Sequence, residues 1–561
     1  MAENSSDSYS DIDPRSGFCR TNRTFYSKRN PVAIPSNQWL DATTYISARP
    51  HRATVAFIDA ATGHRLTFPD LWRAVESVAT SLSVDLAIRK GQTVLILSPN
   101  SIEFPIVFLA VISIGAVVTT ANPLLTSDEI QKQIADSKPV LAFTTLHLIP
   151  KLAASNLPIV LLRSGAVKLN RRSDALRIVD SIEEMMNREV SRNRVKERVH
   201  QDDAATLLYS SGTTGASKGV VTTHRNLIAI TEMLLQRLGS DEEKNRIMVC
   251  TVPMFHIYGV VAFATGLIAA GATVVVLPKF DMHELLTAIQ NFSVNYLPLV
   301  PPILVALTAN AKKLRNKYDL SSLKIINSGG APLSKEVTEE FLKLYPNVMI
   351  RQSYGLTEST AVGASSDTMD ECRKHGSAGL LSPNMAAKIA DPETGESLPV
   401  NRTGELWLKG PAIMKGYFRN EEATNSTLDS EGWLRTGDLC YIDEDGFLFV
   451  VDRIKELIKY NGYQVPPAEL EALLLGHPEI EDVAVIPFPD KDSGQIPMAY
   501  LVRKSGSKIS ETEVMEWIAK KVAPYKKIRR VAFISSIARN PAGKILRKDL
   551  IKLATATSSK I

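Results

Sequence analysis

The stretch Leu207-Leu-Tyr-Ser-Ser-Gly-Thr-Thr-Gly-Ala-Ser-Lys-Gly219 is the most informative part of this chain of 561 residues. An apolar run leads into it, and its glycines let the backbone turn tightly. Backbone amides, several hydroxyl donors and one cation suit a polyphosphate, although the spacing is not that of the P-loop. We therefore predict a phosphate-binding loop that contains Ser210, Ser211, Gly212, Thr213, Thr214 and Lys218.

A flexible linker rich in serine and glycine is the alternative interpretation of this stretch. Its flanks oppose that interpretation, because residues 205–209 and the pair Val220-Val221 are apolar and strand-like. Apolar residues then recur at helical spacing, at Leu227, Ile230, Leu234 and Leu238. A loop held between regular elements is therefore favoured.

Two other segments share one plan of helix, turn and strand. Residues 104–114 are helical in character, and residues 117–120 are strand-like after a Gly-Ala turn. Residues 260–277 repeat the order; this uncharged stretch is long enough for a membrane span, but its glycines and β-branched end divide it. We therefore expect no transmembrane segment. The segments indicate two similar α/β subdomains with parallel sheets covered on both faces, with chance similarity as the alternative.

The composition is that of a globular protein with more than one domain. Hydrophobic residues make up 44% of the chain and charged residues 22%, which excludes disordered and fibrous classes. The formal charge of +5 is small for this length and gives no argument for nucleic acid as a partner. The four cysteines form no C-x-x-C pair, so a reducing compartment is expected, without a zinc ribbon or disulfide framework.

The two ends of the chain carry address information. The first 20 residues are polar and lack an apolar run, so no secretory signal is predicted. The chain ends in Ser559-Lys560-Ile561, which matches the peroxisomal tripeptide Ser-Lys-Leu except that Ile replaces Leu. We therefore expect a peroxisomal location, with an import receptor as a partner. The alternative is an ordinary polar tail on a cytoplasmic protein.

A β-hairpin is predicted from the strand-like runs 439–443 and 447–451, which flank the turn Glu444-Asp445-Gly446. Such a hairpin brings Asp438 beside Arg453 at its open end. A carboxylate next to a guanidinium suits a ribose diol, because the carboxylate can accept both hydroxyl protons. A structural ion pair is the alternative.

Two strand-like runs, 323–327 and 348–351, end in residues suited to a nucleotide. The glycine pair that includes Gly330 would let a flat ligand approach the backbone. Tyr354 offers a ring face to a purine. Glu358 is a hard oxygen ligand suited to a nucleotide-bound Mg²⁺, with an exposed acid at a helix start as the alternative.

Beyond residue 453 the pattern becomes that of a small α+β unit. Residues 468–475 have the pattern of an amphipathic helix, and residues 483–486 and 497–502 are strand-like. Near the end, the turn Arg539-Asn-Pro-Ala-Gly-Lys544 carries a lysine that, taken alone, would be an ordinary solvated residue.

Together these motifs resemble those of the acyl-adenylate-forming enzymes, the superfamily of acyl-CoA synthetases, peptide-synthetase adenylation domains and beetle luciferases. The resemblance spans roughly residues 40–550, with the motifs in the expected order. It is most similar to the plant 4-coumarate:CoA ligase-like group and its peroxisomal-type branch, which Asp13–Cys19 and Tyr209–Val220 suit.

The resemblance implies an α/β fold in two parts. A large N-terminal domain of parallel-sheet subdomains would precede a small, mobile α+β domain. We expect a flexible N-terminal segment at 1–38, the AMP-binding domain at 39–452, the mobile domain at 453–552, and a tail with the address at 553–561.

The same resemblance implies a two-step ligase that uses ATP, Mg²⁺ and coenzyme A. A carboxylic acid would attack the α-phosphate of ATP to give an acyl-adenylate, and the thiol of coenzyme A would then displace AMP. Lys218, Lys544 and Mg²⁺ on Glu358 would reduce the repulsion between the anions. The small domain would rotate about Lys455 between the two steps.

Residue roles are also implied by the resemblance. The catalytic set would be Lys544 for adenylation, Lys459 and Gln464 for the thioester step, and His256 as a gate where the acyl pocket meets the thiol channel, although an isolated His at this position is more often a satisfied core residue. The nucleotide set would be Ser210, Ser211, Gly212, Thr213, Thr214, Lys218, Gly330, Tyr354, Thr357, Asp438, Arg453 and Lys455. The acyl pocket would contain Tyr258, Gln352, Ser353 and Ser365. Coenzyme A would contact Lys279, Gly462 and Asn461, where the family often has Lys.

The sequence leaves open which carboxylic acid is the substrate. Ligases specific for hydroxycinnamates typically read A-G-P-V after the Thr-Glu pair, whereas residues 359–366 here read Ser-Thr-Ala-Val-Gly-Ala-Ser-Ser. A fatty acid or an oxylipin precursor of jasmonate therefore stands beside a hydroxycinnamate. The alternatives to the ligase are a stand-alone adenylating enzyme and a non-catalytic nucleotide-binding homologue, which should have lost Lys544 or Glu358.

Overall fold

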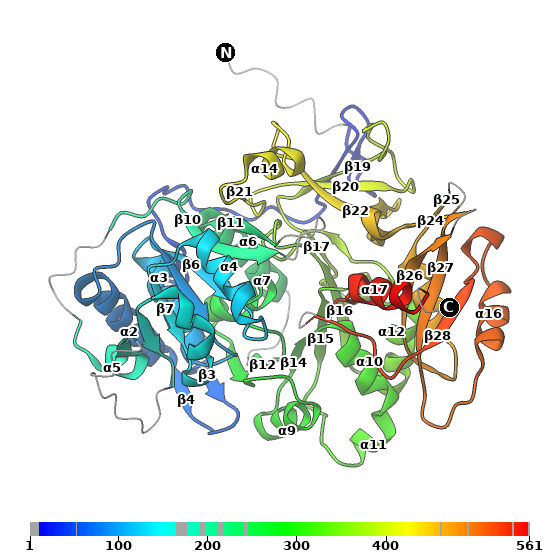
Figure 1. The fold of residues 1–561 in the computed structure, drawn as a ribbon. Coiled ribbons are helices and arrows are strands. Elements are labelled where there is room, and N and C mark those ends of the chain that lie inside the picture. The colour runs from blue at the N-terminus through cyan, green and yellow to red at the C-terminus, as the bar shows by residue number, and fades with distance from the viewer. Residues whose placement is uncertain are drawn as a thin grey trace.

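Three sheets build the large N-terminal domain and a fourth builds the small domain, within the described part of the chain (Figure 1). The computed structural model describes residues 11–51, 53–163, 177–190, 197–210, 217–239, 245–331, 333–460, 463–490, 493–540 and 543–558. The expected α/β fold class, with a small α+β domain at the C-terminal end, is confirmed.

The first sheet contains the strand that leads into the predicted phosphate loop. Its described strands lie in the order β21 (Gly416–Tyr417), β11 (Lys218–Thr223), β10 (Ala204–Ser210), β6 (Val117–Ala121), β5 (Thr93–Leu97), β7 (Leu141–Thr144), β8 (Ile159–Leu161) and β9 (Ile178–Ser181). From β10 to β9 the neighbours are parallel, whereas β11 is antiparallel to β10 and to β21. Helix α4 (Ser127–Ser137) begins at a capping box formed by Thr126 and Glu129.

The second sheet has the same plan, as the sequence indicates. Its described strands lie in the order β18 (Leu380–Leu381), β17 (Ala364–Ser365), β16 (Met349–Tyr354), β15 (Ile325–Gly329), β14 (Tyr296–Leu299), β12 (Ile247–Cys250), β13 (Thr273–Val276), β3 (Val55–Asp59) and β4 (Arg65–Thr67). Its central strands, from β16 to β3, are parallel. The glycine-rich motif after β15 and the Tyr354 motif at the end of β16 therefore emerge at one edge.

The two apolar segments account for the core between these sheets. Helix α3 (Glu103–Ser113) is buried on nearly all sides, between α2 (Phe68–Thr80) and the π-helical segment η3 (Val260–Gly266). The stretch 260–277 divides as predicted, since η3 and the short helix α8 (Leu267–Ala269) precede the turn at Gly271 and strand β13. Among the described residues, no helix has the length and apolar content that crossing a bilayer requires.

The third sheet corrects the expectation of a flexible segment at 1–38. Its described strands lie in the order β1 (Phe18–Cys19), β2 (Thr24–Tyr26), β19 (Ala386–Ala390), β20 (Gly404–Lys409), β22 (Leu434–Ile442) and β23 (Leu448–Arg453). Phe25 of β2 is fully buried against the large core. Strands of two and three residues are too short for an apolar period, so the sequence pattern did not reveal this anchoring.

The small domain begins after β23 and the short 3₁₀ turn η4 (Ile454–Glu456). Its sheet contains β24 (Ile458–Tyr460), β25 (Tyr463–Val465), β26 (Ile480–Asp490), β27 (Gly494–Arg503) and β28 (Arg530–Phe533), covered by α15 (Pro467–Leu475), α16 (Glu511–Ala519) and α17 (Arg547–Ser558). We expected the small domain to end at residue 552 and a tail to follow, but α17 continues to Ser558, and Leu550 and Ala554 pack on the domain core. Residues 559–561 lie outside the described residues.

Candidate active site

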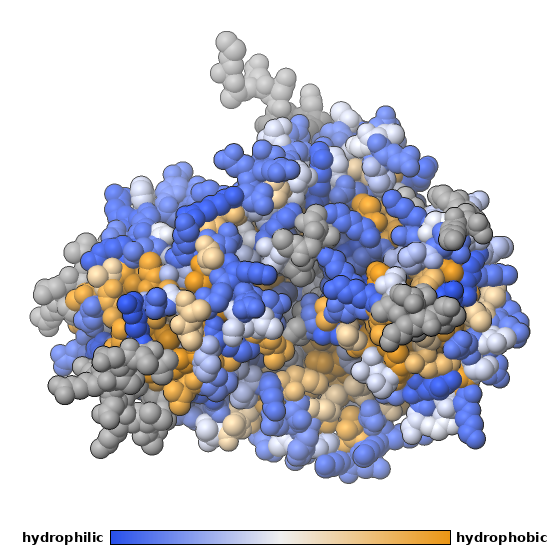
Figure 2. All heavy atoms as spheres, viewed as in Figure 1, coloured by the Kyte–Doolittle hydropathy of each residue, from blue (hydrophilic) through white to orange (hydrophobic). Residues whose placement is uncertain are grey.

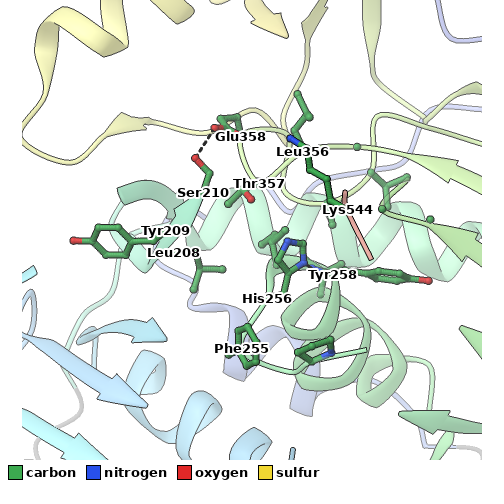
Figure 3. Close-up of a pocket in the computed structure, with 18 of the residues that line it drawn as sticks. Leu208, Tyr209, Ser210, Phe255, His256, Tyr258, Leu356, Thr357, Glu358 and Lys544 are labelled. Carbon is green, nitrogen blue, oxygen red and sulfur yellow. Dashed lines mark hydrogen bonds between the residues drawn. The ribbon is translucent and has the colours of Figure 1, made fainter. Parts of the chain in front are cut away.

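A cavity of about 1160 Å³ lies where the large domain meets the small domain. Its walls come from the ends of β10, β15 and β16, from α6 (His224–Gly239), from the β22–β23 hairpin, and from the turn that carries Lys544. The space-filling view is hollowed near its centre, where these units meet (Figure 2). Figure 3 shows Ser210 and Glu358 at one side of the cavity, with Lys544, His256 and Tyr258 around it.

Glu358 occupies the phosphate end of the cavity and accepts two hydrogen bonds on Oε1. Ser210 Oγ donates at 3.0 Å and Tyr417 Oη at 2.9 Å. The Lys218 ammonium lies 4.9 Å from the centre of the Tyr417 ring. Because both of these hydrogen bonds are accepted by Oε1, the other oxygen, Oε2, suits a hard cation such as Mg²⁺. In the described residues no group of three or more His, Cys, Asp or Glu could hold a metal by itself.

The predicted phosphate loop begins and ends at paired residues. Ser210, the last residue of β10, is the Cα partner of Lys218, the first residue of β11. Ser217 Oγ also donates to the Ser210 carbonyl at 2.8 Å. Ser211, Gly212, Thr213 and Thr214 lie outside the described residues. Ser210, Ser217 and Lys218 line the cavity.

The β22–β23 hairpin brings together the pair that the sequence predicted at its open end. Asp438 and Arg453 are Cα partners, and Arg453 Nε lies 3.3 Å from Asp438 Oδ1. Tyr354 Oη donates to Asp438 Oδ2 at 2.6 Å. Burial raises the pKa of Asp438, whereas Arg453 and the Tyr354 hydroxyl oppose that rise. Arg453 and Gly330 line the cavity, while Asp438 and Tyr354 lie just behind that surface.

The turn that carries Lys544 reaches the cavity from the small domain. Lys544 Nζ lies 3.4 Å from Glu456 Oε1, and Glu456 Oε2 also accepts from Arg547 at 2.5 Å. Burial and the neighbouring Arg453 lower the pKa of Lys544, and Glu456 opposes the shift. Gly543 has φ of +80°, and a Cβ there would lie 3.1 Å from a methyl of Val300. A glycine is therefore required where this turn docks on the large domain.

The other end of the cavity is lined by His256, Tyr258 and Ser353. Burial lowers the pKa of His256 to about 4, so this imidazole is neutral at physiological pH. Tyr258 Oη donates to the Asn327 carbonyl at 3.3 Å. The other two residues expected in the acyl pocket, Gln352 and Ser365, are not among the described residues that line the cavity.

Gln352 and Ser365 form a layer behind that wall. The backbone N–H of Gln352 donates to Ser366 Oγ at 2.8 Å, and Ser365 Oγ donates to Asp367 Oδ1 at 2.7 Å. Ser365 is also the Cα partner of Ser353 across β16 and β17. Gln352 and Ser353 are neighbours on β16 and so face opposite sides of the sheet, which explains why only Ser353 of this pair lines the cavity.

The residues expected to serve the thioester step lie away from the cavity. Lys459 is exposed on β24 and is the Cα partner of Gln464 on β25. Lys279 is exposed after β13. Asn461 and Gly462 lie outside the described residues. Lys455 is exposed but lines the cavity, at the junction between the two domains. The structure therefore brings Lys544, and not Lys459, to the site.

Sequence reasoning missed three charged or polar residues of the site. Tyr417 and Glu456 gave no pattern, because each contacts its partner only through tertiary structure. Arg237 carried a weak signal: it follows Ile230 and Leu234 at helical spacing, where an apolar residue is expected.

Comparison with known proteins gives the same interpretation as the geometry. Residues 45–418 match the AMP-binding enzyme family, and residues 469–544 match the AMP-binding enzyme C-terminal domain. The chain belongs to the AMP-binding enzyme family. It lies in the plant 4-coumarate:CoA ligase-like, peroxisomal-type branch of that family. Peroxisomal OPC-8:0-CoA ligase 1 of Arabidopsis thaliana is 64% identical over 549 residues, covering 98% of this chain and 99% of that protein.

Solved structures of this family share the fold. O-succinylbenzoate coenzyme A synthetase of Bacillus subtilis, in complex with ATP and magnesium ion, is 27% identical with a TM-score of 0.76, covering 91% of this chain and 99% of that one. ATP-bound MatB of Rhodopseudomonas palustris is 25% identical with a TM-score of 0.80, covering 92% and 99%, whereas its apo form gives 0.72.

The predicted activity is thereby confirmed. This AMP-binding enzyme is an ATP-dependent acid–thiol ligase that activates a carboxylic acid through an acyl-adenylate and transfers the acyl group to coenzyme A. It uses ATP and Mg²⁺, with coenzyme A as the second substrate. Glu358 is the residue whose geometry suits the metal.

Proposed function

We propose that this ligase activates a medium- or long-chain fatty acid or an oxylipin precursor of jasmonate, inside the peroxisome. The observation that carries the proposal is the apolar end of the cavity. Leu234 and Leu238 of α6, Met248 of β12, and Val261 and Leu267 of the following helices line it. Burial of alkyl groups against such a wall stabilises the complex by about 25 cal/mol per Å². The 64% identity to a peroxisomal OPC-8:0-CoA ligase supports the substrate class and the location.

The residue roles form the second part of the proposal. Lys218 and Lys544 offset the negative charge of ATP and of the attacking carboxylate, and Glu358 holds Mg²⁺. Asp438 and Arg453 bind the ribose, and Tyr354 and Gly330 border the adenine. His256, being neutral, adds no charge to the route by which the thiol reaches the acyl carbonyl. Thr357, which lines the cavity near Glu358, contacts the α-phosphate.

The proposed domain arrangement is that of the first step. Lys544 in the cavity supports it, as does the greater likeness to ATP-bound than to apo MatB. Rotation of residues 453–552 about Lys455, relative to 39–452, would withdraw Lys544 and deliver Lys459 and Gln464. In that second arrangement Lys279, Asn461 and Gly462 would face coenzyme A.

A panel of acids tests the substrate proposal. ATP–pyrophosphate exchange and CoA-dependent AMP release are measured with saturated C8 to C18 acids, a cyclopentanone-bearing octanoic acid and 4-coumarate. We expect the highest kcat/KM with the aliphatic or cyclopentanone acids, and AMP release only when CoA is present. Preference for 4-coumarate would overturn the substrate class. Exchange without acyl transfer would indicate an adenylating enzyme that lacks the second step.

A further inference from the structure

A buried guanidinium interrupts the apolar end of the cavity. Arg237 lies in the last turn of α6, and its side chain is 9% exposed. It lines the cavity together with Leu234, three residues earlier on the same helix face, and with the next residue, Leu238. A charged side chain is costly to bury and is retained in such a wall only where it is held or used.

Three polar groups fix the direction of this guanidinium. Arg237 Nη1 donates to Ser353 Oγ at 2.9 Å, Nη2 donates to Asn327 Oδ1 at 3.0 Å, and Nε lies 2.9 Å from Asp367 Oδ1. Ser353 and Asn327 end two adjacent parallel strands, so the guanidinium is held at the sheet edge that borders the cavity. Its geometry is therefore set before any ligand binds.

The supporting carboxylate is itself held from the N-terminal segment. Arg29 lies 3.0 Å from Asp367 Oδ2 and 2.6 Å from Glu371 Oε2, and its side chain is nearly buried. Ser365 Oγ also donates to Asp367. One carboxylate thus contacts two guanidinium groups, and the position of Asp367 beside Arg237 is fixed by Arg29.

The position of Arg237 relates it to the acyl chain. Tyr258, which lies across the cavity from Glu358 (Figure 3), donates to the carbonyl of Asn327, and Arg237 donates to the side chain of the same residue. Arg237 and Tyr258 therefore meet at Asn327, in the part of the cavity that Leu234 and Leu238 also line. A long acyl chain whose carboxylate sits between Lys544 and Glu358 would extend toward it.

We propose that Arg237 is a specificity-determining residue that selects acids whose chain bears an acceptor oxygen, such as a ketone or hydroxyl, at the end far from the carboxylate. An unsubstituted alkyl chain would lie against the guanidinium but has no oxygen that could accept a hydrogen bond from it. Because Arg237 keeps its protein partners in either case, the discrimination is about tenfold rather than the 10⁴-fold seen when a buried group loses its only partner. This inference rests on the proposed acyl end of the cavity.

The experiment compares two acids of equal chain length, dodecanoic acid and a dodecanoic acid with a ketone near its far end. kcat/KM for ATP–pyrophosphate exchange is measured for the wild type, Arg237→Met and Arg237→Lys. We expect the wild type to prefer the keto acid about tenfold. Arg237→Met should bring the ratio near one, because kcat/KM falls more for the keto acid than for dodecanoic acid, and Arg237→Lys should retain part of the preference. Gln236→Met, whose native side chain bonds to the Asn30 carbonyl outside the cavity, is the matched control and should keep the wild-type ratio.

Two results would overturn the inference: equal kcat/KM for both acids in the wild type, or an equal fall for both acids in Arg237→Met, which would mark a structural role only. A failure of the proposed function looks different, because neither acid would then support exchange in the wild type.

Discussion

Tyr417 joins the two charged groups at the phosphate end of the site. Its hydroxyl donates to Glu358 at 2.9 Å, while its ring lies 4.9 Å from the Lys218 ammonium. Ser210 donates to the same carboxylate oxygen, so Glu358 is held from both sides. The Glu358 carboxylate and the Lys218 ammonium are thus positioned relative to one another by a single aromatic residue.

Tyr417→Phe should raise the Mg²⁺ concentration that the enzyme needs, while the contact between the aromatic ring and the Lys218 ammonium is kept. The variant keeps the ring but loses one hydrogen bond to a charged acceptor, which is worth about 1.5–3 kcal/mol. We expect the Mg²⁺ concentration for half-maximal pyrophosphate exchange to rise roughly tenfold, with CoA-dependent turnover of supplied acyl-adenylate unchanged. Tyr417→Leu, which also removes the ring, should additionally raise the KM for ATP. Unchanged magnesium dependence in Tyr417→Phe would contradict the positioning role.

Lys544→Ala should abolish adenylate formation and spare the reaction of supplied acyl-adenylate with CoA. Lys544 lines the cavity, as does Lys455 at the junction of the domains, whereas Lys459 is exposed and does not line it. Lys459→Ala is the complementary variant. It should reduce CoA-dependent turnover and leave ATP–pyrophosphate exchange largely intact. Separate assays of the two half-reactions measure both, and equal losses in both assays for either variant would count against the division of labour.

Asp438→Asn should raise the KM for ATP by about tenfold to a hundredfold, because it removes the charge that pairs with Arg453 in a buried site. The Tyr354 hydroxyl would still find an acceptor in Asn. We therefore expect binding of ATP to suffer more than the thermal stability of the protein. Isothermal titration with ATP, compared with a melting curve, distinguishes the two. A large drop in melting temperature with unchanged affinity would assign the pair a structural role.

Asp452 should make stability depend on pH. Burial raises the pKa of this carboxyl to about 6, although the amides of Ala468 and Arg453 donate to it. Below about pH 4 both folded and unfolded states carry the proton. Between pH 4 and 6 only the folded state keeps it, so this contribution to stability falls as pH rises and is lost above 6. Its size is about 3 kcal/mol.

Urea midpoints at pH 4.5 and 7 test this dependence. Asp452→Asn should flatten the decrease between the two values relative to the wild type. Asp445→Asn is the contrasting control, since hydrogen bonds from Lys374 and Arg15 lower the pKa of that exposed carboxyl. The same decrease in the wild type and in Asp452→Asn would show that another group is responsible.

The C-terminal tripeptide should direct import. A fluorescent reporter fused to the N-terminus leaves Ser559-Lys560-Ile561 free and should give peroxisomal puncta, which deletion of these residues should disperse. Ile branches at Cβ whereas Leu does not, so replacement of Ile561 by Leu should sharpen the puncta. A uniformly cytosolic reporter with the intact tail would shift the substrate interpretation toward phenylpropanoid acids of the cytosol.

Local pattern was sufficient for much of this protein. The apolar run that ends at Ser210 indicated strand β10, and the turn at 444–446 placed Asp438 opposite Arg453, because both depend on neighbours close in sequence. The apolar stretch 260–277 was recognised as helix, turn and strand for the same reason. The anchoring of β1 and β2 was missed, since their pairing with β19 joins segments far apart along the chain.

What only the tertiary structure decided is which distant side chains share one space. Tyr417 reaches Glu358, Glu456 is shared by Lys544 and Arg547, and Arg237 is held by Asp367 of one segment, which Arg29 of another supports. No sequence period links such residues, because their distances depend on how the sheets and the small domain pack together. The sequence by itself determined the chemistry of this ligase, whereas the packing of its domains determined that Lys544 lines the cavity and Lys459 does not.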